Sequence, residues 1–212
     1  MYQFIESIKV EDQEVFLLGL HQKRVDETFS HFGKNGDSIN LEKIYEHLNH
    51  EEDGLFKLRI TYDLDKKIRT QMIPYAIPEI GSFQLVENNS YDYSFKFENR
   101  RELDMMKMKA KAEEIIIVKN NHITDTSYSN LLFLKGKEWF TPSTYLLNGV
   151  QRQHLLKTKK IKERDITLQN IKEFSHFQLI NALNDFDENF IYPIHKIVNL
   201  PGNEEYSDLN YL

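Results

Sequence analysis

The sequence contains no cysteine, and this excludes disulfides, cysteine-ligated zinc and a thiol nucleophile. It also has no excess of positive charge, because 27 Lys and Arg residues stand against 33 Asp and Glu residues, a net charge of −6. A general nucleic-acid-binding protein presents a basic face to the phosphate backbone. We therefore expect no nucleic-acid partner.

Long hydrophobic runs are absent as well. No stretch approaches the ~20 apolar residues that a membrane-spanning helix needs, and the opening MYQFIESIKV has neither the basic region nor the apolar region of a signal peptide. We expect a cytoplasmic protein without a membrane partner. The eight histidines show neither HExxH nor zinc-finger spacing, so we expect no metal site. P-loop, GxGxxG and GxSxG motifs are also missing.

Regular apolar patterns predict the elements of the first part of the chain. Tyr2–Val10 roughly alternates and is followed by a polar turn and Val15–Leu18, which predicts a β-hairpin. Helical spacing predicts helices over Leu20–Phe32 and Leu41–Leu48. Alternation predicts strands over Gly54–Tyr62, its antiparallel partner Lys67–Ile73, and Phe83–Val86.

A polar segment between Glu87 and Tyr93 marks the predicted domain boundary. We expect a small α/β domain over residues 1–90 and a larger, β-rich domain over residues 91–212. Strands and helices mixed in two unequal parts indicate the α+β class. For the second part we predict helices over Glu102–Glu113 and around Leu168–Phe174, and strands over Ile115–Val118, Phe177–Leu183 and near Phe190–Ile197.

The stretch Ile123–Arg152 contains the residues that combine into a candidate site. Asp125 lies among small hydroxyl residues, and Gly149 precedes a predicted helix. Taken alone, they are a carboxylate near a strand start and a glycine at a helix N-terminus. Taken together, they suggest a site for an anionic, nitrogen-containing cofactor, since a carboxylate keeps a ring nitrogen protonated and helix N–H groups bind phosphate.

Two basic residues before this stretch have a bland and a functional interpretation. Lys96 lies between Phe95 and Phe97, and is either a surface lysine or one with a lowered pKa that can form a Schiff base. Arg24 is either a solvated arginine or a bidentate phosphate ligand. Their local sequence does not decide between these alternatives.

Four segments in the same order resemble the class IV aminotransferases, which are fold-type IV pyridoxal-phosphate enzymes. FIESIKV with the later HQKR resembles the family's "FETI…H…R" opening, and ITDTSYSNLLF, WFTPSTYLLNGVQR and LINALND are similar to its later segments. The match is colinear over roughly Phe4–Asp185. The family includes branched-chain and D-amino-acid aminotransferases and 4-amino-4-deoxychorismate lyase, and the chain looks most like short bacterial aminotransferase-like members.

The resemblance implies a role for each matching position. Lys96 matches the lysine that bonds to the cofactor and moves the proton at Cα, and Asp125 matches the acid at the ring nitrogen. The remaining cofactor and substrate contacts are implied by position: Arg24, Gly149, Val150, Gln151, Asn181 and Ala182 for the phosphate, Ser129 and Tyr128 for the pocket lining, and Arg59 and Tyr62 for a substrate carboxylate.

The chain departs from the family pattern in places that bear on substrate. The family usually has glutamate where Asp125 stands, so the ring must lie closer, a water must bridge, or the pairing is weaker. Asn181-Ala182 replaces a hydroxyl residue. We expect the family's leading segment, which contributes to the substrate pocket, to be missing. Asn99-Arg100 after Lys96 resembles the lyase branch more than the branched-chain enzymes.

We thus predict a two-domain, fold-type IV enzyme that binds pyridoxal 5′-phosphate between its domains. It would act at Cα of a small amino-substituted substrate, either as an aminotransferase or as a pyruvate-releasing 4-amino-4-deoxychorismate lyase. The resemblance also implies a homodimer. The alternative is a non-catalytic member of the family that binds the cofactor or a partner without turnover.

Overall fold

The computed structural model describes residues 2–33, 38–187 and 190–202. Its contacts divide the chain into two compact units, the first made of Met1–Ile77, Tyr93–Asn99 and Ala182–Asn184, and the second of the remaining segments. The division predicted near residue 90 stays a prediction. The contacts assign the segment with Lys96 to the first unit.

An antiparallel four-stranded sheet forms the frame of the first unit, in the order β2-β1-β3-β4. The strands are β1 (Gln3–Glu11), β2 (Glu14–Val15), β3 (Leu55–Asp63) and β4 (Ile68–Pro74). The predicted hairpin and the predicted antiparallel pair are confirmed. Because side chains alternate along a strand, the even-numbered residues of β1 and their β3 partners share one face.

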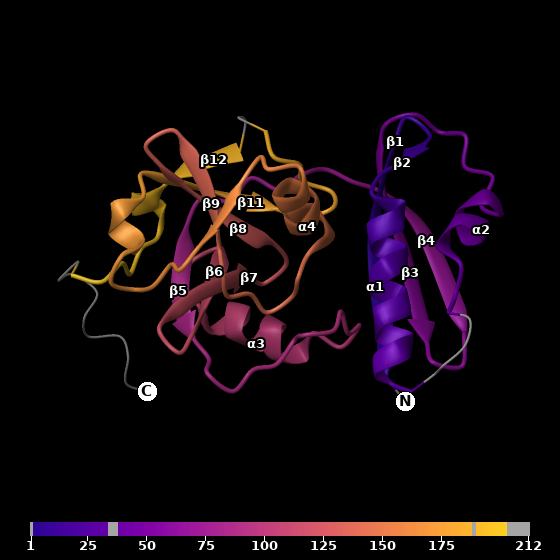
Figure 1. Ribbon diagram of the computed structural model, residues 1–212, viewed down its shortest axis with the longest axis horizontal. Coiled ribbons are helices and arrows are strands. Elements are labelled where there is room, and N and C mark those ends of the chain that lie inside the picture. The colour runs from indigo at the N-terminus through magenta and orange to yellow at the C-terminus, as the bar shows by residue number, and fades with distance from the viewer. Residues whose placement is uncertain (1, 34–37, 188–189, 203–212) are drawn as a thin grey trace. The chain divides into compact units, whose positions relative to one another are not determined.

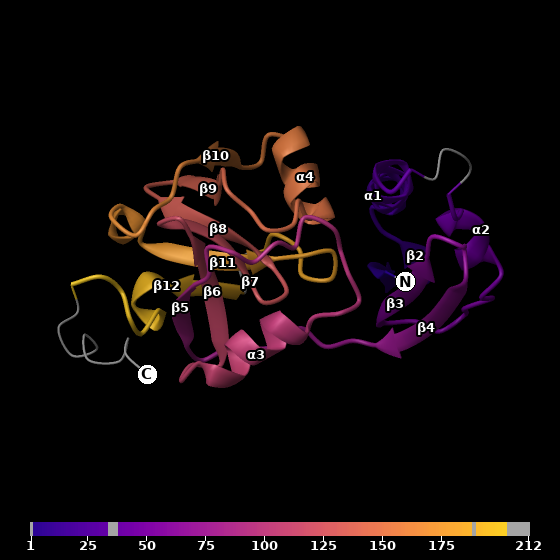
Figure 2. The ribbon, with the colours of Figure 1, turned by 90° about the horizontal axis from the view of Figure 1, so that it is seen from below.

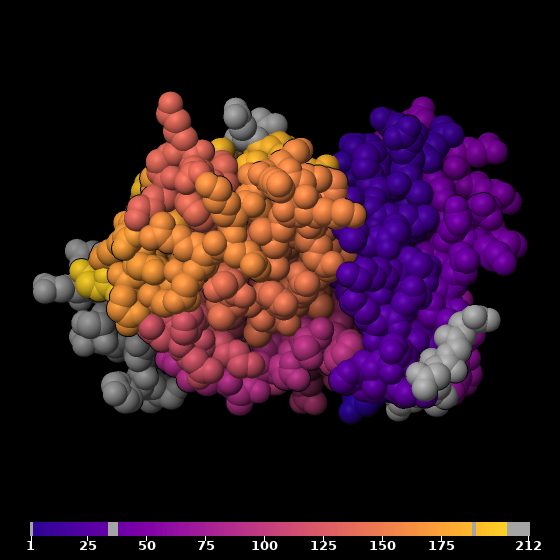
Figure 3. Space-filling model, viewed as in Figure 1, coloured from indigo at the N-terminus to yellow at the C-terminus, as the bar shows by residue number. Residues whose placement is uncertain are grey.

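Two helices cover that face, α1 (Leu18–His31) and α2 (Leu41–Glu46), as the two ribbon views show (Figures 1 and 2). Both were predicted. The left-handed Gly33 (φ 70°) follows the end of α1, and the Asn40 side chain caps α2 by accepting from Lys43 N–H. The side chains of α1 form a continuous face of this unit in the space-filling view (Figure 3). Val25 and Phe29 on α1 pack against the aromatic and aliphatic residues of β1 and β3.

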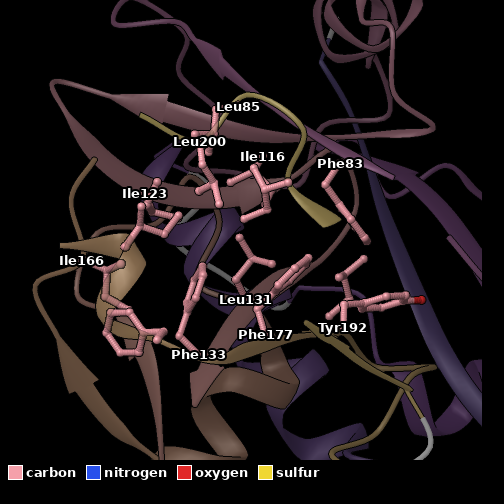
Figure 4. Packing of buried hydrophobic residues seen from close by; sticks show 14 of the residues in the cluster. Phe83, Leu85, Ile116, Ile123, Leu131, Phe133, Ile166, Phe177, Tyr192 and Leu200 are labelled. Carbon is pink, nitrogen blue, oxygen red and sulfur yellow. The ribbon is translucent and has the colours of Figure 1, made fainter. Parts of the chain in front are cut away.

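The second unit contains two sheets around one core. Its five-stranded sheet has the order β10-β9-β8-β11-β12 and its three-stranded sheet the order β5-β6-β7. The core residues point toward one another from strands of both sheets (Figure 4). The strands are β5 (Phe83–Glu87), β6 (Glu114–Lys119), β7 (His122–Thr126), β8 (Asn130–Lys135), β9 (Glu138–Pro142), β10 (Lys162–Arg164), β11 (His176–Ile180) and β12 (Ile191–Pro193).

The second unit contains two α-helices in its described part. Helix α3 (Arg101–Lys109) ends four residues before the predicted Glu113, because Ala110 is extended and the side chain of Glu113 accepts from Gly81 N–H instead. Helix α4 (Val150–Lys157) begins directly after Gly149. No helix in the described part of the chain is long and apolar enough to cross a membrane.

The helix predicted around Leu168–Phe174 is wrong. Only a 3₁₀ turn, η1 (Ile171–Glu173), forms there. The reason is local, because the Asn170 side chain accepts from Thr167 N–H and donates to Asp165 C=O, which closes a turn in place of a helical start. The predicted last strand is shorter than expected, since β12 is followed at once by the 3₁₀ turn η3 (Ile194–Lys196).

Candidate active site

Asp125 is a buried carboxylate with three internal hydrogen bonds. It lies on β7, and its Oδ2 accepts from the backbone N–H groups of Leu146 (3.1 Å) and Leu147 (2.9 Å). Its Oδ1 accepts from Asn130 Nδ2 at 2.8 Å. Since a carboxylate offers about four acceptor positions, one position on Oδ1 is left for a further donor.

Burial dominates the electrostatics of Asp125. Desolvation raises its pKa to about 6, although the hydrogen bonds from Leu147, Asn130 and Leu146 and the more distant charge of Arg152 act in the opposite direction. No salt bridge includes Asp125 among the described residues. A buried carboxylate without a cation is the environment that a protonated ring nitrogen would complete.

The turn that follows Asp125 is fixed by buried polar groups. Ser127 N–H donates to Glu114 Oε1 (3.0 Å), and Ser127 C=O accepts from Arg100 Nη2 (2.8 Å). Ser129 Oγ accepts from Asn181 Nδ2 at 2.9 Å, so the structure brings these two predicted residues together. Tyr128 is half-buried, and the Lys107 ammonium lies 5.8 Å from the centre of its ring. Ala182, next to Asn181 in the chain, is assigned to the first unit by its contacts.

The N-terminus of α4 presents donors without internal partners. Gly149 is the N-cap, with no side-chain capping bond and no acidic residue in the first turn. Val150 and Gln151 are only 2% and 5% exposed, and their backbone N–H groups make no hydrogen bond within the described ranges. Because buried N–H groups nearly always have a partner, and a helix N-terminus favours anions, these two groups are suited to a phosphate.

Arg152 holds this end of α4 against the neighbouring strands. Its guanidinium donates to Pro142 C=O (3.1 Å) and Asn148 Oδ1 (3.1 Å), and it forms an ion pair with Glu163 at 2.5 Å. The side chain is 3% exposed. Arg152 therefore holds the start of α4 in place, and its charge is already neutralised by Glu163.

In the first unit, Arg24 forms a buried cluster with residues that the sequence did not single out. Its Nε lies 2.9 Å from Glu6 Oε1, and its Nη2 lies 2.5 Å from Glu6 Oε2. His21 Nδ1 lies 2.6 Å from the same Glu6 Oε2. Glu6 belongs to the inward row of β1, and His21 and Arg24, three residues apart on α1, face it.

The charges in this cluster follow from burial and pairing. Burial by itself raises the pKa of Glu6, but attraction to Arg24 and hydrogen bonds from His21 and Arg24 outweigh it and lower the pKa to about 2. Burial lowers the pKa of His21, which is therefore neutral and donates its Nδ1 proton to Glu6. His21 Nε2 is buried with no hydrogen-bond partner among the described residues.

Lys96 lies on a short segment attached to β1. Its C=O accepts from Ile5 N–H at 2.9 Å, and the neighbouring Phe97 makes an isolated antiparallel bridge with Phe4. The segment is thus held by strand-like contacts without forming a strand. The ammonium of Lys96 is one of the charges that lower the pKa of His21, which associates it with the cluster of Glu6, His21 and Arg24.

The structure does not bring the predicted substrate residues Arg59 and Tyr62 together. Three positions apart on β3, they leave the strand on opposite faces. Tyr62 is buried against α1, its ring stacked on Phe29, and desolvation raises its pKa. Arg59 lies on the other face and pairs with Glu98 at 3.0 Å.

Three residues of these groups were missed as functional candidates: Glu6, His21 and Asn130. The sequence did contain a signal for Glu6, because it is an acidic residue in an inward-facing row of apolar ones, opposite two basic residues spaced for one helix face. Asn130 gave a weaker signal. An asparagine at the start of a strand is common, and its two bonds cannot be read from spacing.

Comparisons with known proteins identify the family and the fold. A family model described as amino-transferase class IV matches residues 3–197. An uncharacterised protein of Haemophilus influenzae is 33% identical over 187 residues, covering 87% of this chain and 99% of that protein. The crystal structure of a proposed 4-amino-4-deoxychorismate lyase from Haemophilus somnus is 30% identical, with a TM-score of 0.81 over 88% of this chain and 98% of that one. A proposed amino-acid aminotransferase from Mesorhizobium loti shares the fold, with a TM-score of 0.75, 16% identity and coverage of 91% and 98%.

Proposed function

Because the chain belongs to the class IV aminotransferase family, we propose that it is a pyridoxal 5′-phosphate-dependent enzyme that removes a proton from Cα of an amino-substituted substrate. The observation that carries this proposal is the state of Asp125. A buried carboxylate whose pKa is raised by desolvation, and which has no cation paired to it in the described chain, is costly unless a cationic ligand completes it.

The residues present fit this cofactor at its two polar ends. The free acceptor position of Asp125 would take the protonated ring nitrogen, and the N–H groups of Val150 and Gln151 would take the phosphate. Arg24 is the proposed cationic phosphate ligand from the first unit. Three hydrogen bonds fix the carboxylate of Asp125 in one orientation. Because this side chain is one methylene shorter than the family's glutamate, the ring nitrogen would lie closer to β7 or bind through a water.

Lys96 is the proposed base. When bound, pyridoxal 5′-phosphate supplies the electron sink for the carbanion at Cα. Lys96 would accept the Cα proton and return it. Because His21 is neutral, it does not repel the ammonium that Lys96 forms when it takes up the proton. Asp125 would hold the ring nitrogen in its protonated form throughout.

Two reactions are compatible with this proton transfer. Pyruvate release from 4-amino-4-deoxychorismate is supported by the 30% identical neighbour with that proposed activity and by Asn99-Arg100 after Lys96. Transamination is supported by the family as a whole. We propose the lyase reaction as the first to test and transamination as the second. A homodimer and a cytoplasmic location stay predictions.

The decisive experiment is to load the purified protein with pyridoxal 5′-phosphate, reduce it with borohydride and map the modified peptide by mass spectrometry. We expect one pyridoxyl group, on Lys96, and none on K96A. The control is K23A, which removes an exposed lysine of the same unit and should leave labelling unchanged. Labelling at another lysine, or none in the wild type, would reject the proposal.

A product assay then separates the reactions. Loaded protein is given 4-amino-4-deoxychorismate, and pyruvate is measured. In parallel it is given a panel of L- and D-amino acids with 2-oxoglutarate as amino acceptor, and the keto acid derived from each amino acid is measured. Pyruvate only from the first substrate identifies the lyase, and keto acids from the panel identify the aminotransferase. Specific labelling without either product would favour the non-catalytic alternative.

A further inference from the structure

The side-chain amide of Asn130 joins the Asp125 carboxylate to the turn before α4. Asn130 lies at the start of β8 and is 6% exposed. Its Nδ2 donates one proton to Asp125 Oδ1 (2.8 Å) and the other to Leu147 C=O (2.9 Å). The N–H of Leu147 donates to Asp125 Oδ2 at 2.9 Å. Leu147 is thus bound on both sides, by two side chains that are also bound to each other.

Asn130 also explains why residue 149 is glycine. A Cβ added at Gly149 would lie 2.1 Å from Asn130 Oδ1 and 3.3 Å from its Cγ. The backbone there (φ −63°, ψ 147°) is open to any residue, so conformation does not require glycine. The requirement is one of space, and the atom that fills the space belongs to Asn130.

We propose that Asn130 is a positioning residue that sets the start of α4 relative to the Asp125 carboxylate, so that one amide fixes the distance between the two polar ends of the cofactor site. The identity of the ligand rests on the proposed function. The mechanical link between Asp125, Asn130 and Gly149 lies wholly in the second unit and can be tested without any ligand.

The chemistry of the link favours an amide over its close relatives. Both protons of Nδ2 face acceptors, one of them a carboxylate, and bonds of that kind are stronger than neutral ones. Aspartate at position 130 would place a second carboxylate against Asp125 and an acceptor against Leu147 C=O. Serine has a single proton to donate and would serve one partner at most.

The test is a double-mutant cycle of N130A and G149A, with two measurements on each variant: the melting temperature of the cofactor-free protein and the Kd for pyridoxal 5′-phosphate. We expect N130A to lower the melting temperature and to weaken binding roughly tenfold or more. G149A should do the same in the wild-type background and have little further effect in N130A, because the clashing oxygen is gone.

Full additivity would overturn the proposal, since it would mean that Gly149 is required for a reason other than Asn130. If N130A does not fold, the cycle is repeated with N130S, which also removes the amide oxygen that faces residue 149. The matched control is N199A, which removes an amide bonded to both backbone groups of Leu85 in the same unit. It should lower the melting temperature and leave the Kd unchanged.

The two proposals fail in different ways. Wild-type protein that does not bind pyridoxal 5′-phosphate would reject the proposed function, while the melting temperatures of the cycle would still decide whether Asn130 and Gly149 are coupled. Binding by the wild type together with an unchanged Kd in N130A would reject the positioning role alone.

Discussion

Glu6 and Arg24 form a buried ion pair in which two nitrogens of the guanidinium, Nε and Nη2, each lie against a different oxygen of the carboxylate, at 2.9 and 2.5 Å. This edge of Arg24 is therefore occupied within the first unit. Only Nη1 makes no hydrogen bond in the described part of the chain. A guanidinium has five N–H donors, so a phosphate would approach Arg24 from its Nη1 end and not along the Nε–Nη2 edge, which Glu6 occupies.

Breaking this pair should destabilise the protein strongly. E6Q leaves the buried guanidinium of Arg24 without a counter-charge, and R24Q leaves the buried carboxylate of Glu6 without one. Each variant should lower the free energy of unfolding by about 3–5 kcal/mol. The double variant should recover part of the loss. Urea denaturation measures this.

The control is a second pair on the same helix. Lys23 and Glu27, 3.6 Å apart, are both about 60% exposed, so K23A should change stability by less than about 1 kcal/mol. Equal effects for the two pairs would contradict the burial argument.

The same carboxylate should make the protein acid-sensitive. Its pKa of about 2 lies below the ordinary 4.5, so its contribution to stability is present above pH 4.5 and is lost as the pH falls toward 2. The loss should be on the order of 3 kcal/mol. The free energy of unfolding, measured by denaturation between pH 5 and 2, should fall more steeply with decreasing pH in the wild type than in E6Q. The same pH dependence in both proteins would rule out Glu6 as the source.

Asp125 should titrate in the opposite sense. Desolvation raises its pKa to about 6, so folding without cofactor favours its protonated form relative to the unfolded chain. Its contribution to stability therefore decreases as the pH rises from about 4 through 6. A ligand that arrives with a protonated ring nitrogen reverses this preference, and its affinity should increase through the same range.

Carbon-13 NMR of labelled aspartates, assigned with D125N, measures the titration directly. We expect a midpoint near 6 without cofactor and a lower one with it. A midpoint near 4 in the cofactor-free protein would show that the hydrogen bonds outweigh burial.

The contribution of Arg24 to phosphate binding can be separated from its structural role by comparing two ligands. R24K keeps a positive charge opposite Glu6 and loses the planar fork. It should lower the affinity for pyridoxal 5′-phosphate about tenfold and leave that for pyridoxal unchanged, since only the former carries the phosphate. Equal losses for both ligands in equilibrium dialysis would mean that Arg24 does not contact the phosphate. K23A serves as the control.

Arg59 is the one predicted substrate contact whose charge lies at a half-exposed position, paired with Glu98. If it binds a substrate carboxylate, R59A should raise KM about tenfold with little change in kcat. The matched control is R69A, whose guanidinium lies 3.6 Å from the same Glu98 and is 70% exposed. A fall in kcat with constant KM would assign Arg59 to the orientation of the Lys96 segment through Glu98.

The sequence predicts those parts of the structure that local rules control. Alternation located β1 and β3, and apolar spacing located α1, because each of these elements buries one face. The helix predicted to continue to Glu113 failed because Lys111 N–H and Glu113 bond to residues near position 82, a partner that no local pattern reveals. The helix predicted around Leu168–Phe174 failed because the Asn170 side chain accepts from Thr167 N–H and closes a turn there.

The candidate site divides along the same line. Asp125 and Gly149 could be found because their residue types and order resemble a family. What holds them could not, since Asn130 acts through two bonds to residues five and seventeen positions away. Glu6 stands out as an acidic residue in an inward-facing apolar row, but its partners could not be identified, because they lie on a different element and pairing across elements has no period in the sequence.

The segment that holds Lys96 is coded after the chain has already entered the second unit, yet its contacts are with β1: Ile5 binds its backbone and Phe4 bridges Phe97. A gene shuffled between two relatives at a single junction near residue 78 would therefore take β1 from one parent and the Lys96 segment from the other. Recombination that keeps the Lys96 segment with its own β1 needs its junction after Asn99 instead. Chimaeras built both ways would inherit Arg24 from the same parent and differ in the parent of residues 78–99, which include Lys96 and Phe97.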